Sequence, residues 1–260
     1  MDKLEECKHF DKDNRYMAAS DLCAELLKSS AQLEEGMEKR ICSAFIAHLD
    51  DKSLDVQGNA VKCIQKIASR VREKNLVMIV EKMAERVVEG EKETRDIYSL
   101  AIRSIVSEIN DEYAVGMIRT VYPRLVLGIS GPDEVREECL DILAEIFKRF
   151  GPLILRYATL VNKEELMRVV PEQLSREKLS LRKKATNCLG ALAVVLTQKQ
   201  LQQMCLLLID RIRKARTKAD TFTLIQCFGQ MARTVGNKIA QHLGDVFPLL
   251  SEQAWAVSRE

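Results

Sequence analysis

The sequence is poor in the residues that turn a chain sharply. It holds 11 glycines and 5 prolines among 260 residues, about half of the usual share. Aromatic residues make up only 5% of the chain. Because sandwiches and barrels need turn residues every ~8–12 positions, this composition argues against an all-β protein. Hydrophobic residues still make up 47% of the chain, enough for a substantial core. The composition therefore predicts an all-α protein.

Long apolar segments are also missing. The longest run without a charge, Ala185 to Gln198, has 14 residues, short of the ~18–20 that span a bilayer. The first ten residues, MDKLEECKHF, are acidic and lack the apolar core of a signal peptide. The eight cysteines form no CxxC pair, and several lie among aliphatic residues, as a free thiol in a core does. We expect a protein of the cytoplasm and nucleus, with no membrane partner.

Residues that could carry catalysis are scarce. The three histidines, His9, His48 and His242, are too few and too scattered for a zinc site or a catalytic triad. The chain has no HExxH, GxSxG, GxGxxG or P-loop motif. Acidic pairs such as Glu164-Glu165 lie in polar segments, which do not supply the burial that shifts the pKa of a carboxylate. The sequence therefore predicts no enzyme, no metal, no cofactor and no small-molecule substrate.

A helical pattern recurs along the chain. A polar anchor residue is followed by apolar positions three, seven and ten residues later, which share one face of a helix. Anchors spaced by 38 to 46 residues follow this pattern: Gln57, Arg95, Arg136, Arg182, Thr221 and, in a weaker copy whose last apolar residue (Leu26) comes one step late, Arg15. Each anchored helix except the first is preceded by a second amphipathic segment, and these segments cover 37–49, 75–88, 113–129, 163–174 and 199–213.

Two helices in ~40–47 residues is the period of HEAT and armadillo repeats, and little room remains for the third helix of an armadillo unit. The sequence predicts an all-α, right-handed α-α superhelix (solenoid) of about six HEAT repeats. We expect the solenoid over residues 1–250 and a tail outside the pattern over 251–260. A longer connection is expected from Gly151-Pro152 to about Asn162.

The net charge of +2 is too small for a general polyanion binder. Residues 1–130 carry a net charge of −3 and residues 131–260 a net charge of +5, so an anionic partner would prefer the second half.

Arg182 is a repeat anchor, and we interpret it as a structural residue. Basic residues also crowd positions 211–218, which we expect to form a turn between two helices and where the repeat gives them no packing role. Without interleaved aromatics they suit a protein partner better than a nucleic acid. The candidate partner-binding residues are Arg213, Lys214, Arg216 and Lys218; the alternative is a solvated charged turn.

Five segments, taken in order, resemble a known family. They are DKDNRYMAASDLCAELLK (11–28), DVQGNAVKCI (55–64), EKETRDIYSLAI (91–102), ECLDILAEI (138–146) and TLIQCFGQMARTVGNKI (223–239). Together they are similar to the N-terminal HEAT repeats of the cullin-associated, neddylation-dissociated proteins.

The resemblance implies a scaffold that binds a cullin–RING ubiquitin ligase, the cullin and its RING subunit, on the side of the cullin C-terminal domain. It further implies regulation of SCF complex assembly and of neddylation. Family members are several times longer, and their C-terminal repeats carry the element that displaces the receptor adaptor. The family interface is broad and offers no short motif to transfer. The alternatives are a HEAT-repeat fragment of a nuclear-transport receptor or of a phosphatase scaffold, or a fragment without independent function.

Overall fold

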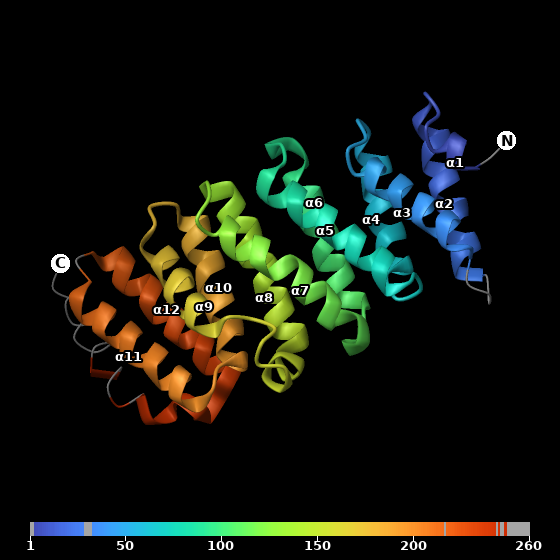
Figure 1. Cartoon of the computed structure of the whole chain (residues 1–260). Helices are drawn as coiled ribbons and strands as arrows, with labels where there is room; N and C mark the ends of the chain where they lie inside the picture. The colour runs from blue at the N-terminus through green and yellow to red at the C-terminus, as the bar shows by residue number, and fades with distance from the viewer. Residues whose placement is uncertain (1–2, 29–32, 216, 243, 245–246, 249–260) are drawn as a thin grey trace. The chain divides into compact units, whose positions relative to one another are not determined.

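The structure is a computed structural model that describes residues 3–28, 33–215, 217–242, 244 and 247–248. Within these ranges the chain forms helices and no β-strand (Figure 1). The predicted all-α class is confirmed. None of the helices described is long and apolar enough to cross a membrane. The chain divides into two compact units, Met1–Ile142 and Leu143–Glu260, and the proposed tail 251–260 lies outside the described residues.

Unit 1 consists of successive helix pairs. The first helices of the pairs, α3, α5 and α7, pack one on the next, and so do the second helices α2, α4 and α6 (Figure 1). The helices, in order, are α1 (Lys3–Glu6), α2 (Lys12–Lys28), α3 (Glu35–His48), α4 (Leu54–Ile67), α5 (Glu73–Glu89), α6 (Lys92–Glu108) and α7 (Asp111–Gly128). Helix α8 (Asp133–Arg156) begins in unit 1 and ends in unit 2.

Neighbouring second helices run in the same direction. The Asn59 side-chain amide donates a hydrogen bond of 3.0 Å to the carbonyl oxygen of Tyr16. One turn further along both helices, the Cys63 thiol lies 3.7 Å from the carbonyl oxygen of Ala19. This parallel register, with partners about one repeat apart in sequence, is that of an α-solenoid.

The predicted anchor residues tie each second helix to the turn before it. The Arg95 guanidinium donates to the carbonyl oxygens of Val87 (3.0 Å) and Gly90 (2.8 Å). The other anchors also donate to carbonyl oxygens of the preceding turn or first helical turn, in the bonds Arg15 to His9 and Phe10, Gln57 to Asp51, Arg136 to Ile129, Arg182 to Arg176 and Thr221 to Thr217. The arginine and glutamine anchors thus hold each second helix against the turn before it, whereas the Thr221 hydroxyl bonds to a carbonyl that already accepts the Thr221 backbone N–H. The structural role predicted for Arg182 is confirmed.

Unit 2 repeats the same arrangement. It contains α9 (Lys163–Glu172), the 3-10 helix η1 (Gln173–Ser175), α10 (Leu179–Val195), α11 (Gln198–Lys214), α12 (Lys218–Val235) and the 3-10 helix η2 (Gly236–His242). The second helices α10 and α12 pack against each other, and α11 packs on α12. Gly190 allows the close approach of α10 and α12, since a Cβ atom there would lie 2.5 Å from Cγ of Gln230.

The prediction of a long connection over residues 151–162 is wrong for the first half of that range. Helix α8 bends at Phe150 (φ −112°, ψ 21°) and continues to Arg156. Pro152 falls in the first turn after the bend. Backbone N–H groups in a first turn make no hydrogen bond within the helix, so proline is tolerated there. Burial of Leu153 and Ile154 stabilises this added turn. The connection is therefore limited to residues 157–162.

Candidate protein-binding surface

The basic run at 211–218 is partly helical. Arg211, Arg213 and Lys214 lie in the last turn of α11 rather than in the turn between helices, so the sequence-based placement was wrong for them. Helix α11 extends this far because Ile212 is buried. Cations in a last turn also interact favourably with the helix dipole. The turn itself is short, and Thr217 ends it by capping α12, where its hydroxyl accepts a hydrogen bond of 3.1 Å from the Asp220 backbone N–H.

The cations of this run differ in their surroundings. Arg211 donates a hydrogen bond of 2.6 Å to the carbonyl oxygen of Pro171, so it has the packing role that the sequence did not reveal. Lys214 forms an ion pair of 2.8 Å with Asp210. Arg213 is exposed and has no polar partner in the described part of the chain. Lys218 is exposed at the start of α12, and Arg216 lies outside the described residues.

A second group of cations lies at the same edge of unit 2. Helix α12 contacts both α10 and η1, and Gly190 lies level with Gln230, one repeat apart in sequence. The turn before α10 therefore lies beside the turn before α12. Arg176 lies in the first of these turns and Lys183 in the second turn of helix α10, and both are exposed. We call the combined set the basic edge, and it comprises Arg176, Lys183, Arg213, Lys214 and Lys218.

Two exposed apolar side chains accompany the basic edge. Leu179, the first residue of α10, is 53% exposed, and Phe222 in α12 is 62% exposed. Neither side chain was predicted from the sequence. Phe222 directly follows the anchor Thr221 and therefore lies outside the helix face that carries the buried positions. This position in the repeat could have predicted from the sequence that its side chain is exposed. Cations around apolar anchors are a composition that protein-binding surfaces use.

Burial raises the pKa of several thiols, whereas the hydrogen bond with Cys63 lowers the pKa of the Cys23 thiol to about 7. All eight cysteines are free and buried. Burial raises the pKa of Cys42 and Cys227 to about 12, and that of Cys205 to about 11. A thiol with so high a pKa stays protonated near neutral pH. Among the described residues, no group of three or more histidine, cysteine or acidic side chains could hold a metal ion.

Comparison with known proteins identifies relatives of the chain. No protein-family model matches it. It is 32% identical over 244 residues to cullin-associated NEDD8-dissociated protein 1 of Arabidopsis thaliana, a match that covers 92% of this chain and 20% of that protein. It is 31% identical over 260 residues to cullin-associated NEDD8-dissociated protein 2 of Mus musculus, covering 96% of this chain and 21% of that protein.

A shorter relative locates the match. The chain is 21% identical over 272 residues to the "Cullin-associated NEDD8-dissociated protein 1, N-terminal part" of Emericella nidulans, covering 92% of this chain and 79% of that protein. The chain is a relative of the N-terminal part of the cullin-associated NEDD8-dissociated proteins. The resemblance stated from the sequence is thereby confirmed. The chain spans about a fifth of the length of the Arabidopsis and mouse relatives.

Solved structures support the fold. The chain matches Kap121p bound to Ste12p with a TM-score of 0.69 at 14% identity, covering 96% of this chain and 27% of that chain. It matches the Mini spindles TOG3 domain of Drosophila melanogaster with a TM-score of 0.55 at 12% identity, covering 91% and 94% of the two chains. At such low identity these likenesses show a HEAT- or armadillo-like helical-repeat fold and nothing of function.

Proposed function

We propose that this chain is a non-enzymatic scaffold that binds a cullin–RING ubiquitin ligase and regulates its assembly and neddylation. The observation that carries the proposal is the sequence match to cullin-associated NEDD8-dissociated proteins, which extends over 92% to 96% of the chain. The helical-repeat fold supports it, because each repeat contacts only its neighbours and leaves extended faces for a partner. The proposed site of action is the cytoplasm and nucleus.

The partner in this proposal is the cullin with its RING subunit, bound on the side of the cullin C-terminal domain. The basic edge is our candidate for part of the contact. Its exposed cations suit an acidic patch on the partner, and Leu179 and Phe222 supply apolar anchors beside them. Charges of this kind steer association and are sensitive to salt.

The test is direct binding of the purified chain to an unneddylated cullin–RING complex immobilised on a sensor. Saturable binding is expected, together with inhibition of modifier attachment when the chain is in excess. A cullin–RING complex that already carries the modifier serves as the matched control and should bind more weakly. Absence of saturable binding to the unmodified complex would reject the proposed function.

A further inference from the structure

Two cysteine thiols meet between the second helices α2 and α4 of unit 1. The Cys63 thiol lies 3.7 Å from the carbonyl oxygen of Ala19, and the Cys23 thiol lies 3.9 Å from the carbonyl oxygen of Cys63. In an α-helix the Ala19 carbonyl accepts the backbone N–H four residues later, which is that of Cys23. Each thiol therefore lies against the backbone beside the other cysteine. A hydrogen bond joins the two thiols.

Packing holds α2 and α4 close together at this level. Ala19 and Ala60, each within about one turn of the pair, are fully buried, and such small side chains permit close approach of two helices. One turn before Cys63, the Asn59 side-chain amide donates a hydrogen bond of 3.0 Å to the carbonyl oxygen of Tyr16. This bond fixes the register of the two helices. A disulfide requires the two cysteines to lie close together, so this arrangement favours a bridge between them.

The two thiols differ in acidity. The hydrogen bond from Cys63 lowers the pKa of the Cys23 thiol to about 7 against the opposing effect of burial, and the positive charge of Lys66 adds to the lowering. The same hydrogen bond raises the pKa of Cys63. At pH 7 about half of the Cys23 thiol is ionised, compared with about one part in 10⁵ for Cys42, whose pKa is about 12. Cys23 is therefore the better nucleophile of the pair.

We propose that Cys23 and Cys63 are an oxidisable pair, which hydrogen peroxide converts into a disulfide between α2 and α4. The Cys23 thiolate attacks one oxygen of the peroxide, so that an S–O bond forms, the O–O bond breaks and hydroxide leaves. The sulfur of Cys63 then attacks the resulting sulfenic acid. The S–S bond forms, the S–O bond breaks, and the thiol proton of Cys63 leaves with the hydroxyl group as water. The two sulfur atoms lose two electrons, and the peroxide gains them.

The disulfide changes how the first two repeats are connected. Neighbouring units of a solenoid are otherwise joined by packing and hydrogen bonds, and the new bond links α2 to α4 covalently. Cys23 and Cys63 are 4% and 3% exposed, which favours a small oxidant over a bulky thiol reagent. In a reducing compartment a disulfide of this kind is transient and reports oxidation. This modification is independent of the proposed function.

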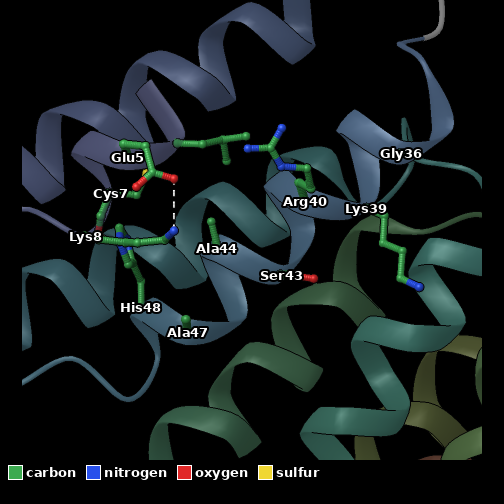
Figure 2. A pocket seen from close by; sticks show the side chains of 11 residues that line it. Glu5, Cys7, Lys8, Gly36, Lys39, Arg40, Ser43, Ala44, Ala47 and His48 are labelled. Carbon is green, nitrogen blue, oxygen red and sulfur yellow. Dashed lines mark hydrogen bonds and ion pairs between the residues drawn. The ribbon is translucent and has the colours of Figure 1, made fainter. Parts of the chain in front are cut away.

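A third cysteine supplies an internal competitor for the pair. Cys7 lies in the turn after α1 and lines a pocket of about 400 Å³ beside α3 (Figure 2). Its charge, when ionised, contributes to raising the pKa of Cys63, so the two residues lie in the same neighbourhood. The crossed contacts described above, however, join Cys63 to the Cys23 side of α2. We therefore expect Cys63 to bond to Cys23 and not to Cys7.

The test uses the full chain, reduced and then treated with equimolar hydrogen peroxide at pH 7. Remaining thiols are blocked with iodoacetamide, and tryptic peptides are analysed by mass spectrometry. The peptides 16–28 and 63–66 should be linked by a disulfide, with the loss of two of the eight thiols. Dithiothreitol should restore both thiols. Cys63→Ala should leave a sulfenic acid on Cys23 that dimedone traps, and Cys23→Ala should slow thiol loss by about tenfold or more.

Cys7→Ala and Cys42→Ala are the matched controls and should form the same linked peptides as the parent chain. Circular dichroism checks that every variant keeps its helix content. The proposal is overturned if Cys23 and Cys63 remain reduced, if another pair of cysteines is linked instead, or if Cys23→Ala loses thiols as fast as the parent. A disulfide-linked dimer on a non-reducing gel would also overturn it, since the bond would then join two chains.

Discussion

The guanidinium of Arg15 forks onto the carboxylate of Asp51, with Nε 2.7 Å from Oδ2 and Nη2 2.8 Å from Oδ1. The Ser53 backbone N–H donates to the same carboxylate at 2.8 Å. Burial alone would raise the pKa of Asp51, but the hydrogen bonds from Arg15 and Ser53 outweigh it and lower the pKa. The pair joins the first anchored helix to the turn before α4.

Replacing Asp51 by asparagine should therefore lower the free energy of unfolding at pH 7 by about 1–3 kcal/mol, because it leaves a partly buried guanidinium without its counter-charge. The folded-state pKa of Asp51 lies below its unfolded value, so the carboxylate stabilises the fold above about pH 4. This stabilisation is lost as the pH falls further and the carboxylate becomes protonated. Urea unfolding should be measured at pH 7 and pH 3. The difference in free energy of unfolding between variant and parent should be smaller at pH 3. Asp55→Asn, at an exposed ion pair with Lys12, is the control and should change stability by less than about 0.5 kcal/mol.

Two glycines should respond in opposite directions to alanine. A Cβ atom on Gly128 would lie 2.4 Å from Sγ of the buried Cys139 and 3.2 Å from side-chain carbons of Val88 and Val135. We expect Gly128→Ala to cost about 1–3 kcal/mol through overpacking. Gly58, inside α4, would place its Cβ atom in open space, so Gly58→Ala should stabilise the chain by about 0.5–1 kcal/mol. Thermal unfolding of both variants measures this, and a destabilised Gly58→Ala would contradict the helix interior described for α4.

The eight buried cysteines should be protected from thiol reagents in the folded state. Burial keeps the pKa of Cys42 and Cys227 at about 12, so at pH 8 almost no thiolate forms at these positions. Reaction with a chromogenic disulfide reagent should be slow for the native chain and should titrate eight thiols after unfolding in urea. Rapid reaction of several thiols in the native chain would show that the repeats open more readily than the packing indicates.

The basic run at 211–218 predicts an effect on the rate of association with the partner. Replacing Arg213, Lys214 and Arg216 together by serine should slow binding to an unneddylated cullin–RING complex, most strongly at low ionic strength, and leave thermal stability nearly unchanged. Lys199→Ser, which removes an exposed lysine at the other end of α11, is the matched control. Equal association rates for the triple variant and the parent at low salt would exclude these residues from the interface.

The repeat pattern predicted the fold because it reports burial directly. The positions that follow Arg95 and Arg136 by three, seven and ten residues are Tyr98, Ile102, Ile105, Cys139, Leu143 and Ile146, and all of them are buried. Features that depend on contacts with distant parts of the chain, or on a side chain's exposure, could not be predicted from the repeat pattern. Nothing in the local sequence around Pro152 shows that Leu153 and Ile154 find a buried site. Phe222 is notable for its exposure rather than for any sequence motif.

The hydrogen bonds between repeats have a consequence for how the chain is made. Gln65 bonds to Glu108, Cys63 to Ala19 and the Arg72 backbone to Glu38, so the partners lie 34 to 44 residues apart in sequence. Each repeat thus needs only the repeat synthesised just before it to complete its polar contacts. Contacts this local favour rapid folding. During translation, unit 1 can acquire its structure from the N-terminal end onward while later residues are still inside the ribosome, and an incomplete chain exposes little more than one unpaired helix face at a time.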